Sequence, residues 1–470
     1  MRTAASNCAL WRCLLGVGCG ALAACTASAE DVRPPADQLF FPTGLVTSPD
    51  QTVMFVANAN SELRYDSGTI GVIDLEAVQD VIEKWTAAAP EASAGCKQDP
   101  DHRETLVCDE APLMRASAAA RIGNFATDIA LQDFSDGGLR VLVPTRGDPS
   151  IAWADYDGSR LICKSGSDSY QLCDDAHRLT AVHGDANFPI PTEPFGVFAD
   201  GRNGFAIVTH LSLGAVTLID SSAGRAAQVA DMKLGLFGPD PTTGIRAATG
   251  VAGRLAPTTD ADGKAIINDV VYVGSRTENR IQTFTIARLK DADDTLRPAY
   301  LLNSSFFFLN TVGTLGGGGS SDTRSLEFSG TGEQMYVVNR DPPTLQVFDT
   351  SAGPTGLPRN TATGASDICR QASTARSVGV GDSERVYVTC FQDGQVYVID
   401  PRGQSQIEDV ITVGRGPYGI AAAKGRDPVL MSTFLFVSNF LEDTVAVIDI
   451  SPASVHRNRV VLRIGTPRPQ

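Results

Sequence analysis

The sequence lacks the short motifs that mark most well-known classes of enzyme. It contains no Gly-x-Ser-x-Gly elbow, no phosphate-binding P-loop, no His-Glu-x-x-His zinc motif and no kinase signature. The glycine-rich stretch 313–319 (GTLGGGG) has no strand pattern before it and no helix pattern after it, so it is interpreted as a loop rather than a dinucleotide-binding turn. We therefore expect no catalytic residue from a known motif and no bound cofactor.

Basic residues are fewer than acidic ones, tryptophans are few, and haem-attachment motifs are absent. The chain has 470 residues, with 39 Lys and Arg against 54 Asp and Glu, and a formal net charge of −15. A general binder of nucleic acid or of anionic membranes needs a net basic face, so the composition argues against both. With three tryptophans and no Cys-x-x-Cys-His motif, a haem- or quinone-dependent redox protein is disfavoured.

Beyond the first 25 residues there is no long apolar run, and the one at the N-terminus is short. Residues 13–24 (CLLGVGCGALAA) follow Arg2 and Arg12 and are too few to span a bilayer as a stable helix. The run ends in Leu-Ala-Ala-Cys at 22–25, which resembles the bacterial lipobox. Residues 1–24 are then a lipoprotein signal peptide and Cys25 is the lipidated residue. An ordinary cleaved signal peptide is the alternative, and Cys19 is a weaker lipidation site.

The segment 25–40 is polar and contains prolines, so we expect it to tether a soluble domain to its lipid. Thr26, rather than Asp, follows Cys25, which by analogy with Gram-negative sorting favours the outer membrane of the cell envelope and leaves the leaflet open. The expected partner is thus a membrane, reached through the lipid anchor.

Six cysteines follow Cys25, and they fall into three local pairs. An exported protein lies in an oxidising compartment, where disulfides are the natural interpretation. Six cysteines allow 15 pairings, and proximity in sequence favours Cys96–Cys108, Cys163–Cys173 and Cys369–Cys390. Metal binding is the rival interpretation, but the absence of Cys-x-x-Cys makes a zinc ribbon improbable.

Short hairpin patterns recur along the chain. In 434–450 (FLFVSNFLEDTVAVIDI), two β-branched and aromatic runs flank a turn rich in Asn and Asp, which indicates strand, turn and strand. Seven such hairpins are found: 55–75, 142–157, 207–222, 271–287, 336–351, 387–402 and 436–451.

Another strand precedes each hairpin, and a fourth often follows. The preceding strands are predicted at 42–50, 126–133, 194–201, 246–253, 323–330, 375–382 and 417–425, with fourth strands at, for example, 226–235, 408–414 and 459–465. Four antiparallel strands repeated seven times predict an all-β fold, a seven-bladed β-propeller, because radial packing covers both faces of every blade. We place it at 41–466, with an acidic insert at 77–111 in blade 1 and a tail at 467–470.

The segment 42–74 carries Pro-x-Gly, Pro-Asp, Phe-Val-Ala-Asn, Gly-Thr-Ile and Val-Ile-Asp in order. It resembles the YVTN-type repeat of bacterial β-propellers, as do the last two repeats. Pro144 in the second repeat and the missing Val-Ile-Asp ending of the fourth depart from it. The resemblance implies a propeller over about 42–465. Its relatives include surface-layer proteins, export-associated lipoproteins and lactonase-like enzymes, so it leaves function open.

Arginines gather at positions that a propeller brings to one mouth of its channel, where the inner strands start and the hairpins turn. The inner-strand starts are Thr43, Thr127, Phe195, Arg246, Arg324, Arg376 and Tyr418, and the turns add Arg146, Arg276 and Arg340. Bidentate arginine contacts suit an anion, so the expected ligand-binding residues are Arg246, Arg324, Arg376, Tyr418, Arg276 and Arg340. Alternatively, each arginine pairs with a nearby acid, for which Asp128, Asp148, Glu278, Asp341, Asp393 and Asp443 are available.

Metal-binding patterns are incomplete. His177, His183 and His210 could form a site, but nothing in the sequence fixes their geometry. Asp260-Ala261-Asp262-Gly263 begins like a calcium loop and lacks the distal glutamate. Solvated histidines and a strand-connecting turn are the simpler explanations, so no metal site is expected.

The mouth positions contain few carboxylates, and this decides between two classes of function. We expect a non-enzymatic, lipid-anchored propeller of the cell envelope that binds a partner protein or an anionic ligand at its mouth. The alternative is a lactonase-like or other hydrolase with its active site at the same mouth, which needs a cluster of acid, base or metal-binding groups there.

Overall fold

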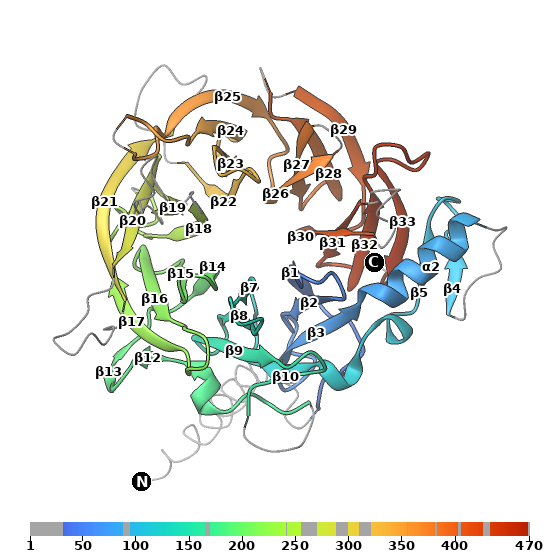
Figure 1. Cartoon of the computed structure of the whole chain (residues 1–470), viewed down its shortest axis with the longest axis horizontal. Coiled ribbons are helices and arrows are strands. Elements are labelled where there is room, and N and C mark those ends of the chain that lie inside the picture. Colours follow the sequence, from blue (N-terminus) through green and yellow to red (C-terminus); the bar gives the residue numbers. More distant parts are fainter. Residues whose placement is uncertain are drawn as a thin grey trace, which may run out of the picture.

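A computed structural model of the chain describes residues 32–87, 95–164, 170–240, 242–254, 270–287, 299–309, 321–354, 356–380, 383–402, 406–425 and 433–468. Its strands form seven sheets arranged radially around a central channel (Figure 1). The predicted seven-bladed β-propeller is therefore confirmed. Cys19, Cys25 and the glycine-rich stretch 313–319 lie outside the described residues.

Each blade contains four strands in chain order from the channel outward. Blade 1 consists of β1 (Pro42–Thr47), β2 (Val53–Asn58), β3 (Gly68–Asp74) and β6 (Ala120–Ile122). Blade 2 consists of β7 (Ala130–Asp133), β8 (Leu139–Thr145), β9 (Ser150–Tyr156) and β10 (Leu161–Ile162), with β11 (Arg178–Leu179) also on β9. Blade 3 consists of β14 (Pro194–Asp200), β15 (Phe205–His210), β16 (Ala215–Asp220) and β17 (Gln228–Lys233), extended by β12 (Ala181–Val182) and β13 (Asp185–Pro189).

The remaining blades follow the same plan. Blade 4 consists of β18 (Ala248–Arg254), β19 (Val270–Ser275), β20 (Arg280–Ala287) and β21 (Tyr300–Phe308). Blade 5 consists of β22 (Thr323–Phe328), β23 (Gln334–Arg340), β24 (Pro343–Asp349) and β25 (Thr361–Asp367). Blade 6 consists of β26 (Ala372–Val380), β27 (Ser383–Cys390), β28 (Gln395–Asp400) and β29 (Gln406–Thr412). Blade 7 consists of β30 (Pro417–Lys424), β31 (Thr433–Asn439), β32 (Thr444–Asp449) and β33 (Arg459–Ile464).

The central strands are apolar on both faces because each blade packs between two others. All six residues of β2 are buried, as are all six of β32. Seven core clusters lie between successive pairs of blades, including the pair formed by blades 7 and 1. A continuous β-branched and aromatic run in this sequence therefore marks a middle strand of a blade.

Hydroxyl groups on the second strand of a blade donate to the inner strand of the next blade around the channel. The Thr209 hydroxyl donates to the carbonyl of Thr249 at 2.6 Å, and the Thr389 hydroxyl donates to that of Tyr418 at 3.0 Å. The Ser438 hydroxyl donates to the carbonyl of Thr43 at 2.6 Å, which joins the last blade to the first. These bonds hold the inner strands close together, so their small residues are needed for packing.

All three predicted disulfides are confirmed. Cys96–Cys108, Cys163–Cys173 and Cys369–Cys390 are bonded. The first joins two strands of the blade 1 insert, β4 (Cys96–Gln98) and β5 (Leu106–Cys108). The insert also contains helix α2 (Leu75–Ala87) and the 3-10 turns η1 (Ala111–Leu113) and η2 (Ala116–Ala118); a third such turn, η3 (Asp175–His177), precedes β11.

The insert also closes the ring. Strand β5 pairs in parallel with β33 of blade 7, with Leu106 opposite Leu462 and Cys108 opposite Ile464. The Thr105 hydroxyl donates to the Val460 carbonyl at 2.6 Å. Figure 1 shows this hairpin and α2 outside β33. A segment inserted in blade 1 therefore extends the sheet of blade 7 at its outer edge.

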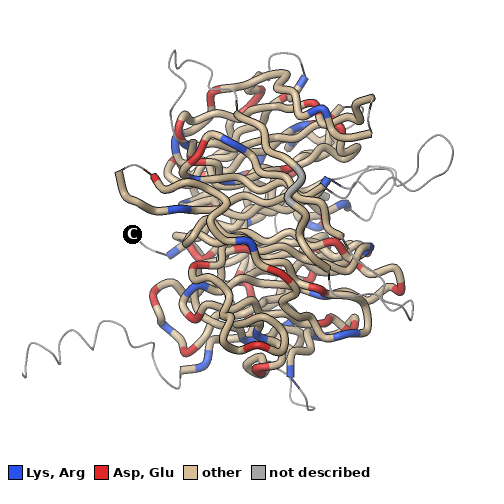
Figure 2. The backbone as a smooth tube through the Cα atoms, turned by 90° about the vertical axis from the view of Figure 1, so that its left-hand side faces the viewer, with Lys and Arg blue, Asp and Glu red and all other residues tan. Residues whose placement is uncertain are grey.

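Charge is mixed around the disc. In the side view, acidic and basic residues are interspersed over the loops and edges that face the viewer (Figure 2). Among the described residues, the helices are too short or too polar to cross a membrane.

Candidate functional site

A cavity of about 380 Å³ lies at the mouth of the channel. Inner-strand starts and hairpin turns line it, as the sequence predicts for this face. Its charged and hydroxyl-bearing lining includes Thr43, Thr127, Asp128, Arg146, Thr249, Arg324, Arg340, Ser373 and Tyr418. Its aromatic lining is Phe125, Phe195, Phe391 and Phe440. The cavity thus combines cationic and aromatic surfaces with one carboxylate.

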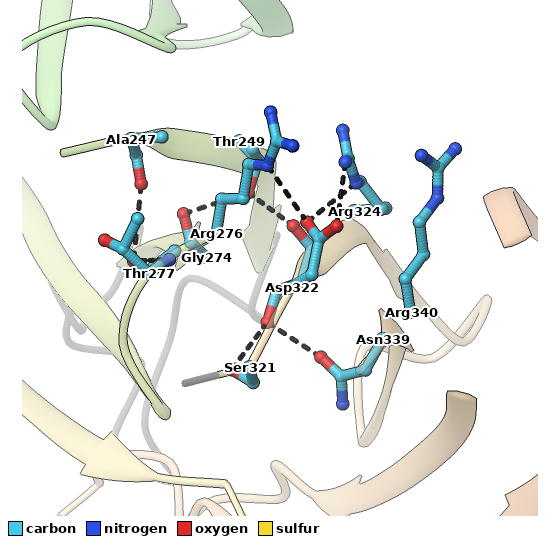
Figure 3. A network of polar contacts seen from close by, with 12 residues as sticks. Ala247, Thr249, Gly274, Arg276, Thr277, Ser321, Asp322, Arg324, Asn339 and Arg340 are labelled. Carbon is cyan, nitrogen blue, oxygen red and sulfur yellow. Dashed lines mark hydrogen bonds and ion pairs between the residues drawn. The ribbon is translucent and has the colours of Figure 1, made fainter. Parts of the chain in front are cut away.

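Two arginines at the mouth share an acid. Arg324 pairs with Asp322 at 2.8 Å, and Arg276 approaches the same carboxylate at 3.9 Å (Figure 3). Likewise, Arg146 pairs with Glu193. Three of the arginines singled out from the sequence therefore have a local counter-charge, as the ion-pair interpretation requires.

Arg340 differs from its neighbours. Its Nε donates to the Ala372 carbonyl at 2.6 Å and its Nη2 to the Ser373 hydroxyl at 3.1 Å, and both partners are neutral. Figure 3 shows Arg340 beside Arg324, with the Asp322 contacts directed to Arg324 and Arg276. Burial, and then the Arg324 charge, lower the pKa of Arg340 to about 10. Within the described part of the chain no carboxylate forms an ion pair with Arg340, and Asp322, which Arg324 and Arg276 contact, attracts it only at longer range, so the mouth holds a cation without a direct counter-ion.

Asp128 is the carboxylate of the cavity. Its Oδ1 accepts the N–H of Ile129 at 2.9 Å and its Oδ2 accepts the N–H of Val197 at 3.0 Å, so it bridges blades 2 and 3. These bonds favour the ionised form, but burial outweighs them and raises the pKa of Asp128 to about 6. A carboxyl with this pKa is ionised at neutral pH and can still accept a proton.

Glycine occupies the position of Asp128 in four other blades. A Cβ at Gly44 would lie 2.6 Å from the Ile129 nitrogen, and one at Gly419 would lie 2.1 Å from the Thr43 carbonyl oxygen. These inner strands therefore approach too closely for a side chain. Blades 2, 5 and 6 have Asp128, Ser325 and Thr374 at this position, and all three residues line the cavity, where Asp128 is the ionisable one. The signal in the sequence is Ala-Thr-Asp at 126–128, where blade 1 has Pro-Thr-Gly.

Tyr418 lies within electrostatic range of these groups. Burial, and then the Asp128 charge, raise the pKa of Tyr418 to about 12. The Arg324, Arg340 and Arg146 charges partly offset this rise. The tyrosine therefore stays protonated at neutral pH and can donate a hydrogen bond into the cavity.

Two of the predicted site residues lie elsewhere, and this corrects the expected register of two inner strands. In blade 4, Ala248 pairs with Ser275, so Thr249 rather than Arg246 takes the mouth position. In blade 6, Ala372 pairs with Cys390, so Ser373 takes the mouth position. Arg376 lies further along β26 and approaches Glu327 at 3.4 Å. Arg276 lies at the rim, outside the cavity lining.

The histidines have structural partners. His210 is buried and bonded to the Thr217 hydroxyl at 2.8 Å, and burial lowers its pKa to about 4. His177 packs on Trp153 and contacts Asp174 at 2.6 Å. In the ranges that the structure describes, no three His, Cys, Asp or Glu side chains gather as metal ligands. Asp260 and Asp262 lie outside those ranges.

Comparisons with known proteins show the fold. No family model matches the chain, and none of the curated proteins does. Among solved structures, a Lactobacillus plantarum protein has a TM-score of 0.49 at 15% identity, over 75% of this chain and 89% of that one. Periplasmic gluconolactonase of Pseudomonas aeruginosa gives 0.45 at 16%, over 80% and 86%. A Bacteroides uniformis protein with the provisional name 6-phosphogluconolactonase gives 0.47 at 12%, over 92% and 98%. Likenesses at this level agree with the propeller architecture, which the seven sheets of the structure establish, and carry no argument about activity.

The expected non-enzymatic binder is corrected at this point. Propellers named as lactonases occur among these structures, but likenesses this remote do not argue for an activity. The expectation depended on a mouth with few carboxylates, whereas the structure places Asp128 inside the cavity, and this favours the hydrolase alternative. The fold alone does not assign an activity, so the case for one has to come from the cavity.

Proposed function

We propose that the mouth cavity is the active site of a lactonase-like hydrolase that acts on small lactones or esters bearing a negative charge. The observation that carries the proposal is the sharing of one cavity by Asp128, with a pKa of about 6, and Arg340, whose charge no described carboxylate neutralises. Attack of water on an anionic ester requires at least a general base that activates the water and a cation that stabilises negative charge, and the cavity contains both.

In this mechanism Asp128 acts as general base. Its carboxylate takes a proton from water, and the water oxygen forms a bond to the ester carbonyl carbon. The carbonyl π electrons move onto oxygen, where the Arg324 and Arg340 guanidiniums and the Tyr418 hydroxyl stabilise the negative charge. The tetrahedral intermediate then expels the alkoxide, which takes the proton back from Asp128. Lactone and water thus become a hydroxy acid.

The test measures hydrolysis of lactones and of 4-nitrophenyl esters, each in a neutral and a carboxylated or phosphorylated form. Wild-type protein should prefer the anionic member of each pair, and its rate should rise with pH through about 6 as Asp128 ionises. Asp128→Asn should lower kcat/KM about 100- to 1,000-fold, since it removes the base and keeps the shape.

Asp101→Asn, on the exposed blade 1 insert, is the matched control and should hydrolyse at the wild-type rate. Because Asp128 also bridges two blades, the melting temperature of the variant is measured alongside. Equal rates for Asp128→Asn and wild type, with both folded, would exclude this role, and so would the absence of turnover on every substrate.

We also propose that Cys25 carries a lipid and holds the propeller at the outer membrane. Support comes from the arginine-flanked apolar run that ends in Leu-Ala-Ala-Cys. Cells expressing the protein and fed labelled palmitate should label it, and Cys25→Ala should abolish the label. Cys19→Ala is the matched control and should keep it. Labelling that depends on Cys19 instead would show that the site has been misplaced.

A further inference from the structure

A second cavity of about 470 Å³ lies on blades 6 and 7 and adjoins the mouth. The two cavities share Gln371 and Phe391 in their linings. The second is bounded further out by Leu441, Arg415, Gln392, Asp393 and the turn glycines at 394 and 416, so its carboxylate would repel an anionic group there. It is therefore a lateral groove, which starts where the mouth ends.

The wall between the cavities is aromatic. The Phe440 ring lies 6.4 Å from the Tyr418 ring and 6.1 Å from the Phe391 ring, between centroids. Tyr418 and Phe440 line the mouth, and Phe391 lines both cavities. An apolar surface thus leads from beside the arginines outward to Leu441, whose side chain is 41% exposed.

Tight turns keep the groove open. Gly394 has φ +69° and Gly416 has φ +69°, a region that L side chains rarely adopt. A Cβ at Gly416 would lie 2.8 Å from the Leu441 side chain. A larger residue there would displace the leucine that borders the groove.

The cation beside the groove, Arg415, already has partners within the protein. Arg415 approaches Glu442 at 3.5 Å and donates to the Arg468 carbonyl at 2.5 Å. By contrast, the cation in the adjoining mouth, Arg340, has neutral partners. Charge recognition therefore belongs to the mouth and apolar contact to the groove, which suits a molecule with an anionic head and a hydrocarbon tail.

We propose that the groove binds the acyl or alkyl chain of an amphipathic anionic substrate whose head lies at Arg340. The claim that this ligand is a substrate rests on the proposed function. Phe391 and Leu441 would then set chain-length specificity. Burying a methylene is worth about a three- to fourfold gain in affinity, so the preference for longer chains should be steep until the groove is full.

The experiment titrates the protein with acetate, butyrate, hexanoate and octanoate by isothermal calorimetry, which needs no turnover. Octanoate should bind wild-type protein at least tenfold more tightly than acetate. Leu441→Ser should reduce that ratio about threefold or more while leaving acetate binding unchanged, and Phe391→Ala, which also alters the mouth, should reduce the ratio by at least as much. Arg340→Gln should weaken all four carboxylates by a similar factor.

Leu213→Ser is the matched control, because Leu213 is an exposed leucine in the corresponding hairpin turn of blade 3, away from the groove. It should keep the wild-type ratio. Equal affinity for acetate and octanoate, no octanoate binding at millimolar concentration, or an unchanged ratio in both groove variants would overturn the inference. Octanoate binding without ester hydrolysis would instead reject the proposed function and keep the groove.

Discussion

Arg324 and Arg340 lie side by side at the mouth but have different surroundings. Arg324 pairs with Asp322, and its side chain is 11% exposed. Arg340 meets a carbonyl and a hydroxyl, and its lowered pKa shows that the fold disfavours its charged form. A pKa of about 10 still leaves the arginine charged at neutral pH, so this cost is present throughout the physiological range. The charge of the first arginine is therefore balanced by a carboxylate of the fold, and the second arginine has no direct counter-ion and is available to bind an anion.

Arginine-to-glutamine variants at these two positions should separate the roles. Arg324→Gln should lower the free energy of unfolding by about 2 kcal/mol at pH 7, because it leaves a half-buried Asp322 with a weak partner at 3.9 Å. Arg340→Gln should leave the free energy of unfolding unchanged or raise it by about 1 kcal/mol, because it removes a buried charge next to Arg324.

Urea unfolding of both variants measures the difference. Arg359→Gln is the control and should change little, because Arg359 and its partner Asp349, 3.7 Å away, are both solvent-accessible. If Arg340→Gln destabilised the protein more than Arg324→Gln did, Arg340 would be part of the structural framework and the mouth would lose its free cation.

At the scale of the strand, the sequence predicts where the strands lie better than it predicts their register. The seven hairpins are visible because each middle strand is buried on both faces, which leaves a run of β-branched and aromatic residues such as TFLFVSN in β31. Inner strands are rich in small residues, so their alignment is ambiguous, and in blades 4 and 6 the predicted alignment is off by three positions. That ambiguity misplaced Arg246 and Arg376, since Thr249 and Ser373 occupy the equivalent mouth positions.

Asp128 shows a different limit of the sequence. Its role depends on a close approach between inner strands that no single repeat reveals, because the glycine at this position in four other blades is required by a neighbouring backbone. In sequence it is one acid among many, and it was considered only as an ion-pair partner. Only the assembled ring shows that its side chain, unlike those of the acids that pair with arginine, lines the cavity.

At the scale of the whole molecule, the ring closes between blades 7 and 1, which no segment of chain connects directly. Everywhere else the chain passes from the outer strand of one blade to the inner strand of the next, but β33 and β1 are near opposite ends of the sequence. The β4–β5 hairpin compensates by pairing with β33, and Leu106 is 2% exposed in the core that blades 1 and 7 share. The first blade therefore holds the last one through its insert.

Leu106→Ala should accordingly loosen this junction in particular. The lost packing should cost about 2–4 kcal/mol of unfolding free energy. Leu301→Ala provides a matched control, since Leu301 is 3% exposed on the outer strand of blade 4, in the core between blades 3 and 4. Both variants should lose similar stability, but hydrogen exchange should separate them. Amides of β33 and β1 should exchange faster in Leu106→Ala, and those of β17 and β21 in Leu301→Ala. If Leu106→Ala left exchange at β33 and β1 as slow as in wild type, the hairpin would not stabilise this junction. The packing of blades 1 and 7 alone would then close the ring.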